Sequence, residues 1–485
     1  MSTKKDLLSG VFWTALSRYS GFFIQIVITA VLARLLTPED FGVIAIALVF
    51  ITFFNLLSDF GIGPAIIQVK DLDNNEINSI FSITIWGGVF LAIFFFYLSY
   101  PISSVYNSDD LKVVLQILTI DIVFVTWNIV PNAIILKEKK FKLISLRTLF
   151  LQFVSGILSI VAAYHGAGIY ALVLSPVITA IGIFITNYYH TNLKFIISFN
   201  KTSIRKIYKF SIYQLLFNLS NYFFRNLDKI LIGKYLSMKD LGYYDKSYHL
   251  MLMPMNYTSS IFNQVLHPIL SDLQKDYHEL AIKYNKVVQI LAFISFPIGT
   301  FLYFASEDVI MVLYGSQWRP AISVFHILSL SIPLQLILTT IGSVYQAAGD
   351  TKRLFYTGLA SSVITILGFL VALIVYKSID AVAWSWNITL LFSFIINYYT
   401  LYKITLHENL WPFIRSLKIP LILSVFCSLL LIPYSLFIPP SLYLLNLGLK
   451  AIIVLIVTII VLHHFHIVDF QNLRLKYSVY KKRFM

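Results

Sequence analysis

Long apolar segments, each followed by a short polar or charged connection, recur along almost the whole of this sequence. Each apolar run holds about twenty residues, which as a helix cover a hydrocarbon core of roughly 30 Å. The apolar residues are continuous and do not alternate with polar ones, so the pattern predicts helices and excludes a membrane β-barrel. Only these two structures satisfy their backbone hydrogen bonds inside a bilayer. The chain is therefore predicted to be an all-α integral membrane protein.

The hydropathy pattern predicts about fourteen transmembrane helices, in two series of six and a final pair. The first series covers 10–32, 42–66, 79–100, 111–136, 145–164 and 169–189. The second series covers 208–232, 241–266, 287–304, 321–345, 355–376 and 381–402, and the final pair covers 413–432 and 441–462. The eighth span contains enough polar residues that a hydropathy window alone can miss it.

An internal repeat accompanies the two series. Residues 33–42, Ala-Arg-Leu-Leu-Thr-Pro-Glu-Asp-Phe-Gly, resemble residues 233–242, Gly-Lys-Tyr-Leu-Ser-Met-Lys-Asp-Leu-Gly, at an offset of 200. Both segments join the first predicted helix of a series to its second, and internal repeats are typical of transporters. We predict two pseudo-symmetric six-helix lobes, 1–207 and 208–405, related by an axis along the membrane normal. Residues 406–485 then contain the last two helices and a basic tail.

Composition and charge agree with a membrane location. Of the 485 residues, 58% are hydrophobic and only 12% are charged, and the mean hydropathy is +0.78. Lysine and arginine concentrate in alternate connections and at both ends, which predicts cytoplasmic termini and an even number of spans. The net charge of +14 is explained by this topology, and no nucleic-acid partner is predicted. The single Cys427 lies in an apolar span, so neither a disulfide nor a metal site is predicted.

Polar residues follow one face of four predicted helices. Thr14, Arg18, Gly21 and Gln25 step by four, three and four along the first helix, which places them on one face. A charged group facing lipid costs about 2.5 to 3.5 kcal/mol on insertion scales, so these faces are predicted to line a hydrated cleft between the lobes. The other three faces hold Thr52, Asn55 and Asp59 in the second helix, Gln214, Asn218, Asn221, Arg225 and Asp228 in the seventh, and Asn256, Ser260, Asn263 and His267 in the eighth.

Two interpretations of these polar faces are open. Neutral residues such as Asn218 and Ser260 fit hydrogen bonding that holds the bundle together equally well as contact with a ligand. For Arg18 and Arg225 a functional role is favoured, because a purely structural guanidinium would need a buried carboxylate partner.

Intramembrane carboxylates are candidates for binding a coupling proton or sodium ion, and no other cofactor is predicted. The three candidates are Asp59, Asp121 and Asp228. Lys450 in the last span is interpreted as a snorkelling side chain.

Several short motifs occur in a characteristic order. Residues 32–42 are followed by Leu-Ser-Asp-Phe-Gly-Ile-Gly at 57–63. Later motifs are Arg-Asn-Leu-Asp-Lys at 225–229, Leu-Gly-Tyr-Tyr at 241–244, Tyr-Gly-Ser-Gln-Trp at 314–318 and Gln-Ala-Ala-Gly-Asp at 346–350. Over roughly 1–402 the chain resembles the polysaccharide transporters of the O-antigen and teichuronic-acid flippase type. This family belongs to the multidrug, oligosaccharidyl-lipid and polysaccharide exporter superfamily, which implies a two-lobed, V-shaped, alternating-access fold.

The resemblance implies a flippase, not an enzyme, in the bacterial cytoplasmic (inner) membrane. It would carry an undecaprenyl-pyrophosphate-linked oligosaccharide to the outer leaflet for surface polysaccharide or lipopolysaccharide biosynthesis, beside a polymerase and glycosyltransferases. Arginine suits pyrophosphate oxygens, and amides suit sugar hydroxyls. The candidate substrate-binding residues are Arg18, Gln25, Asn55, Gln214, Asn218, Asn221, Arg225, Asn256 and Asn263.

Two alternatives are considered. A drug or metabolite exporter of the same superfamily would favour a cleft dominated by carboxylates, whereas arginine and amides predominate here. A membrane-embedded glycan polymerase or acyltransferase would usually need a large outer loop or a His/Asp constellation near one surface, and the predicted outer connections are short. No P-loop motif occurs in the connections, so ATP use is not predicted.

Overall fold

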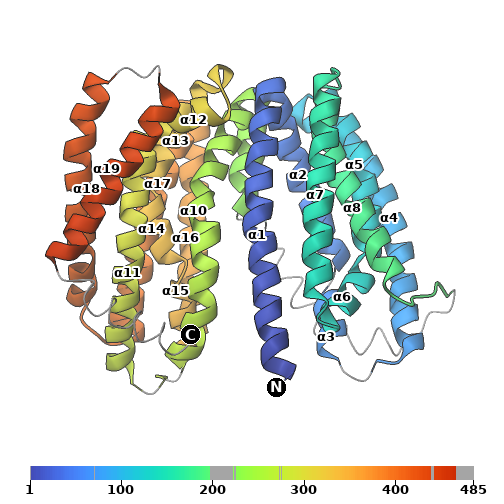
Figure 1. Cartoon of the computed structure of the whole chain (residues 1–485), viewed down its shortest axis with the longest axis horizontal. Coiled ribbons are helices and arrows are strands. Elements are labelled where there is room, and N and C mark those ends of the chain that lie inside the picture. The colour runs from blue at the N-terminus through green and yellow to red at the C-terminus, as the bar shows by residue number, and fades with distance from the viewer. Residues whose placement is uncertain are drawn as a thin grey trace, which may run out of the picture. The chain divides into compact units, whose positions relative to one another are not determined.

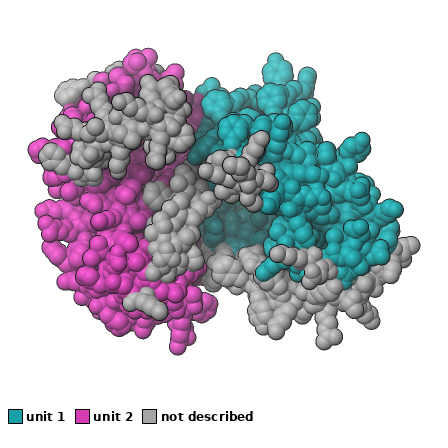
Figure 2. Space-filling view, turned by 60° about the horizontal axis from the view of Figure 1, so that its bottom comes forward, with its two compact units in different colours: residues 1–245 teal, residues 246–485 magenta. Residues whose placement is uncertain are grey.

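The computed structural model describes residues 2–59, 61–69, 72–196, 222, 225–271, 273–274, 276–438 and 442–465. All regular elements in these ranges are helices, so the prediction of an all-α fold is confirmed. The chain divides into two compact units, 1–245 and 246–485, which Figure 2 colours separately. The lobe boundaries expected near 207 and 405 stay predictions.

The first unit contains eight labelled helices and a further helical stretch at 225–235. The labelled helices are α1 (Ser2–Leu35), α2 (Pro38–Asp59), α3 (Ile62–Gln68), α4 (Asn74–Tyr106), α5 (Asp109–Trp127), α6 (Ile129–Lys137), α7 (Phe141–Tyr164) and α8 (Tyr170–Tyr189) (Figure 1). Helix α10 (Met238–Ser271) begins in this unit and continues in the second.

The second unit is likewise helical in its described part. Its elements after α10 are α11 (Tyr277–Phe304), α12 (Ser306–Leu313), η1 (Ser316–Trp318), α13 (Pro320–Ser329), α14 (Ile332–Leu338), α15 (Ile341–Ala347), α16 (Thr351–Val371), η2 (Ala372–Tyr376), α17 (Ile379–Tyr399), η3 (Thr400–Thr405), α18 (Trp411–Phe437) and α19 (Tyr443–His464). The stretches η2 and η3 are π-helical and continue α16 and α17.

Eleven described helices are long and apolar enough to cross a membrane, and twelve if the pair 320–329 and 332–347, bent by 49°, is one span. The expected seventh span lies mostly outside the described residues. The expected eighth span is the helix α10, which is absent from this set because its residues are too polar. The total of fourteen therefore stays a prediction, while the multi-pass membrane assignment is confirmed.

The two copies of the internal repeat fold in the same way. Each begins a helix with a hydroxyl and an aspartate three residues apart, which satisfy otherwise unpaired groups at the helix start. The Thr37 hydroxyl donates to Asp40 at 2.8 Å, and the backbone N–H of Asp40 donates to that hydroxyl oxygen at 3.3 Å. The Ser237 hydroxyl and Asp240 make the same pair of bonds at 2.7 and 3.0 Å. The offset of 200 in the sequence is thus an equivalence in local structure.

The glycines that end the two repeats lie against each other. A Cβ on Gly42 would overlap the Met238 carbonyl oxygen, and a Cβ on Gly242 would overlap the Pro38 carbonyl oxygen. The same two Cβ atoms would lie 3.1 and 3.3 Å from the backbone nitrogen of the opposite glycine. The contact is reciprocal at the offset of 200, so these two helix starts are related locally by a pseudo-two-fold axis. Only glycine permits so close an approach of the two backbones.

We expect Gly42→Ala to lower the stability of the protein by about 1 to 3 kcal/mol, because the added methyl group meets a backbone carbonyl that cannot rotate away. The melting temperature of the purified protein in detergent measures this effect. Gly87→Ala is the matched control, since Gly87 also lies inside a helix and a Cβ there meets nothing within 4 Å. Equal melting temperatures for the two variants would contradict the close contact.

The last two helices belong to the second unit, where they pack beside α11 and α12 (Figure 1). Their shared core contains Phe293 of α11, Leu423, Cys427 and Leu431 of α18, and Val454, Val457 and Val461 of α19. Cys427 is fully buried there, as expected for an inert thiol.

The interpretation of Lys450 as a snorkelling side chain is wrong. Lys450 is only 7% exposed, and its ammonium group lies 2.6 Å from the Asp308 carboxylate and 2.8 Å from the Phe304 carbonyl oxygen. The buried carboxylate of the neighbouring helix α12 holds the lysine inside the protein, so the charge has no need to reach the membrane surface. This ion pair fixes α19 to α12.

Candidate functional site

The polar face of α1 contacts α7, which lies beside it (Figure 1). The Gln152 side-chain amide donates to the Gly21 carbonyl oxygen at 2.9 Å and to the Gln25 side-chain oxygen at 3.2 Å. Gln25 therefore helps to hold α1 against α7, which agrees with the interpretation that polar faces hold the bundle together. Arg18, on the same stripe, has an exposed side chain. A guanidinium in an exposed position lies where a ligand can contact it.

Asn55 and Asp121 come together from different helices. The Asn55 amide donates to the Asp121 carboxylate at 3.1 Å and so joins α2 to α5. Asp121 is only 6% exposed, and the buried Oδ1 of Asn55 accepts no hydrogen bond in the described part of the chain. The pair combines one candidate ion-binding residue with one candidate substrate-binding residue and keeps an unused acceptor. Such a pair is suited to bind or release a proton or small cation.

Asp59 lies in a different environment, at the break between α2 and α3. Its carboxylate accepts a hydrogen bond from the Gly63 backbone N–H at 3.3 Å, and the side chain is half-buried. Gly61, between the two, has a φ of 71°, a left-handed conformation that glycine adopts readily. Asp59 thus stabilises the start of the short helix α3.

Asp228 lies in a buried polar network. Its carboxylate is 3% exposed and accepts a hydrogen bond from the Tyr244 hydroxyl at 3.1 Å. The neighbouring Lys229 forms an ion pair of 2.7 Å with Asp245. These contacts tie the helical residues 225–235 to the start of α10. Arg225, one turn earlier, has an exposed side chain.

The remaining candidates are distributed as follows. Asn256 of α10 has an exposed side chain. Gln214, Asn218 and Asn221 lie outside the described residues, as does the side chain of Asn263. The structure brings together Asn55 and Asp121, whereas Gln25 and Asp228 each bind other neighbours. The assignment of these residues to substrate or ion binding stays a prediction.

The aspartate that ends the 346–350 motif has a structural role. Asp350 begins α16 and accepts hydrogen bonds from the Thr405 hydroxyl at 2.8 Å and from Arg353 at 2.6 Å. Burial by itself raises the pKa of the Asp350 carboxyl, but the hydrogen bonds from Thr405 and Arg353 outweigh burial, and the pKa lies below its usual value. The motif thus links the start of α16 to the end of η3 and keeps this carboxyl ionised.

One buried polar residue was not identified from the sequence. Arg147 lies inside α7, not in a basic connection, and is only 8% exposed. Its guanidinium donates to the Asn187 side-chain oxygen, and the Asn187 amide donates to the side-chain oxygens of Asn128 and Asn132 at 2.7 and 3.4 Å. The feature of the sequence that points to its burial is its position, since Arg147 is the seventh residue of an apolar helix.

Comparisons with known proteins place the chain in a family. The model of a family described as "Polysaccharide biosynthesis protein" matches residues 31–323, more than half of the chain, and the MatE model matches residues 274–374. An uncharacterized membrane protein in the cps region of Klebsiella pneumoniae is 26% identical over 90% of this chain and 91% of its own length.

Two further relatives have names that refer to surface polymers. The teichuronic acid biosynthesis protein TuaB of Bacillus subtilis is 26% identical over 87% of this chain and 88% of its own. The lipopolysaccharide biosynthesis protein WzxC of Escherichia coli is 25% identical over 88% of this chain and 87% of its own.

Among solved structures, the lipid II flippase MurJ in an inward closed conformation gives a TM-score of 0.70 at 16% identity, over 94% of this chain and 99% of its own. An inward-facing multidrug MATE transporter gives 0.61 at 12% identity, over 82% of this chain and 94% of its own. These similarities show the fold. With its family match over 31–323, this multi-pass membrane chain belongs to the polysaccharide biosynthesis protein family.

Proposed function

We propose that this chain is a flippase that moves an undecaprenyl-pyrophosphate-linked oligosaccharide from the cytoplasmic to the outer leaflet of a bacterial inner membrane. The observation that carries the proposal is the family match over 31–323, joined to relatives whose names refer to teichuronic acid and lipopolysaccharide biosynthesis. The fold shared with a lipid II flippase supports it. A glycosyltransferase or a glycan polymerase is a proposed partner. The glycosyltransferase makes the lipid-linked oligosaccharide, and the polymerase consumes it after transport.

Two exposed arginines support a pyrophosphate ligand. Arg18 and Arg225 each present a planar, permanently charged group with several donors, which suits phosphate oxygens better than an ammonium group does. Counted by helical rise, Arg18 lies roughly 12 Å from the predicted cytoplasmic end of its span and Arg225 roughly 25 Å along its own. We infer that Arg18 receives the pyrophosphate near the cytoplasmic side and Arg225 holds it nearer the outer side. Sugar hydroxyls would bond to Asn55, Asn256 and the other amides.

The membrane potential favours this direction of transport. An inside-negative potential drives an anionic headgroup outward, and the movement lowers its free energy by about 2.3 kcal/mol per charge per 100 mV. Export can then proceed without ATP, and an ion is needed only for the return of the empty carrier. The proposed orientation, with both termini in the cytoplasm, places the basic connections on the side where the substrate is made.

Deletion of the gene in its native host tests the function. We expect surface polysaccharide to disappear and its lipid-linked precursor to accumulate in the cytoplasmic leaflet, where periplasmic glycosidases cannot reach it. Resistance to cationic drugs should not change. If drug resistance falls while surface polysaccharide is retained, the chain is an exporter of the multidrug type.

We expect the triple variant Asp59→Asn, Asp121→Asn, Asp228→Asn to lose any dependence of transport on pH or sodium. An amide does not take up a proton near physiological pH, and it does not attract sodium as a carboxylate does. Export measured in vesicles with imposed proton or sodium gradients checks this, and the single variants show which carboxylate matters. If transport by the triple variant still depends on pH or sodium, these aspartates do not bind the coupling ion.

A further inference from the structure

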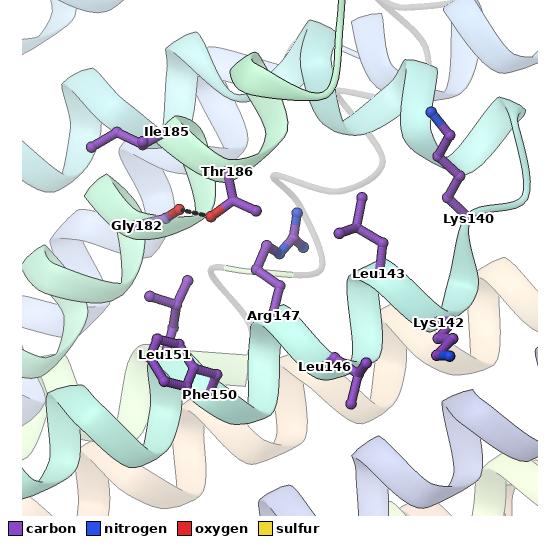
Figure 3. A pocket seen from close by; sticks show the side chains of 10 residues that line it. All are labelled: Lys140, Lys142, Leu143, Leu146, Arg147, Phe150, Leu151, Gly182, Ile185 and Thr186. Atoms are coloured by element: carbon purple, nitrogen blue, oxygen red, sulfur yellow. Dashed lines mark hydrogen bonds between the residues drawn. The ribbon is translucent and has the colours of Figure 1, made fainter.

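A groove with a volume of about 750 Å³ runs along the outside of α7 and α8 in the first unit. Figure 3 shows its basic end at the start of α7, with Lys140 and Lys142, and its apolar end farther along the two helices. The lining residues are Lys140, Lys142, Leu143, Leu146, Arg147, Phe150, Leu151, Gly182, Ile185 and Thr186. A hydrocarbon wall that ends in positive charge matches the shape of a lipid with an anionic headgroup.

Arg147 is the charged group at the centre of this groove. In Figure 3 its side chain extends from α7 into the space between the helices. It is 8% exposed, it forms no ion pair with any carboxylate in the described part of the chain, and its buried Nε has no hydrogen-bond acceptor there. Its neighbour Asn187 is a neutral amide, which orients the guanidinium without neutralising it. A buried charge without a counterion costs several kcal/mol, so a bound anion would offset a real penalty.

The other two cations of the groove already have partners. The Lys140 ammonium lies 2.6 Å from the Glu138 carboxylate. The Lys142 ammonium lies over the Trp13 ring, 5.3 Å from its centroid. Arg147 differs from both, because it is the buried cation of the groove and pairs with no carboxylate among the described residues.

The apolar walls decide which kind of anion fits. Leu146, Phe150 and Ile185 are 47%, 65% and 57% exposed and line the groove on both sides of Arg147 (Figure 3). Arg147 lies roughly 9 Å along α7 from its first residue, Phe141, and so near one end of this apolar helix. A soluble anion would contact Arg147 but leave these walls uncovered, whereas a phospholipid covers both.

We propose that the groove between α7 and α8 binds an anionic glycerophospholipid, with its phosphate on Arg147 and an acyl chain along Leu146, Phe150 and Ile185. The site lies on one side of a single lobe and is separate from the residues proposed for glycan transport. Its ligand would be a resident membrane lipid that stabilises the pairing of α7 with α8. The proposal does not depend on the flippase function.

Native mass spectrometry of the purified full chain in neutral detergent tests the site. We expect phosphatidylglycerol to be retained about tenfold better than phosphatidylcholine, as one well-placed guanidinium predicts. Arg147→Gln should abolish this preference, and Arg147→Lys should keep part of it. Lys239→Gln is the matched control, because Lys239 is an exposed cation at the start of α10 and lies outside the groove.

A second variant separates binding from folding. Leu146→Trp narrows the groove but leaves Arg147 and Asn187 in place, and Leu146 is exposed enough to accept a larger ring. It should also reduce phosphatidylglycerol retention to the level of phosphatidylcholine. Equal retention of the two lipids by the unaltered protein would overturn the proposal, and so would full retention by Leu146→Trp. Displacement of phosphatidylglycerol by inorganic phosphate would show that the groove binds an ion. A preference for undecaprenyl phosphate would show that it binds a transport substrate. Either result also overturns the proposal of a phospholipid site.

Discussion

Arg18→Ala and Arg225→Ala are each expected to abolish export of the lipid-linked glycan. Hydrogen bonds between a charged donor and a phosphate contribute about 1.5 to 3 kcal/mol each, so loss of one bidentate contact lowers binding by about a hundredfold or more. Both side chains are exposed, so little packing is lost with them. Surface polysaccharide, measured at matched amounts of protein in the membrane, reports the effect.

Two controls distinguish charge from shape. Arg18→Lys and Arg225→Lys retain the charge without the planar fork and should leave partial export. Lys239→Gln removes an exposed positive charge outside the polar faces and should leave export unchanged. Full export by either alanine variant would refute the role of that arginine in binding pyrophosphate.

Asp308→Asn or Lys450→Met is expected to destabilise the protein by about 3 to 5 kcal/mol, because each change leaves a buried charge without its partner. The two groups are only 2.6 Å apart, and their side chains are 2% and 9% exposed. The pair fixes α19 to α12, so the loss should first be seen as detachment of the last helix. Thermal unfolding in detergent, together with proteolysis of the 438–442 connection, measures both effects.

An exposed pair supplies the comparison. Lys112 and Asp109 form an ion pair of 3.2 Å in which Asp109 is 98% exposed, so Lys112→Met should cost no more than about 1 kcal/mol. The double variant Asp308→Leu, Lys450→Met removes both buried charges and should be more stable than either single variant. A double variant as unstable as the singles would show that packing, and not charge, dominates at this position.

Hydropathy and the internal repeat were sufficient for the fold class. A run of about twenty apolar residues that do not alternate with polar ones can cross a bilayer only as a helix. The repeat was informative because its hydroxyl, aspartate and glycine positions act locally. Thr37 with Asp40, and Ser237 with Asp240, cap helices through bonds that span three residues. Such bonds depend on sequence neighbours, so a pattern at fixed spacing predicts them.

The polar stripes were predicted as faces, but their partners were not. Periodicity places Gln25 on one side of a helix, yet it does not say that Gln152 of α7 lies opposite. The same holds for Asn55, which meets Asp121, 66 residues away in sequence. Interhelical partners depend on how whole helices pack, and that packing is decided by the shapes of all their side chains together.

The sequence by itself determined that this protein spans the membrane many times, that the segment 33–42 recurs at 233–242, and which polar residues share a helical face. These properties follow from local chemistry, since backbone hydrogen bonding in lipid and helical periodicity act over a few residues. Only the tertiary structure decided that Lys450 is held by Asp308 and that Arg147 is buried beside amides in a groove. A charged residue in an apolar helix has the same sequence signature whether it reaches the surface or finds a partner, and only the neighbouring helices separate the two outcomes.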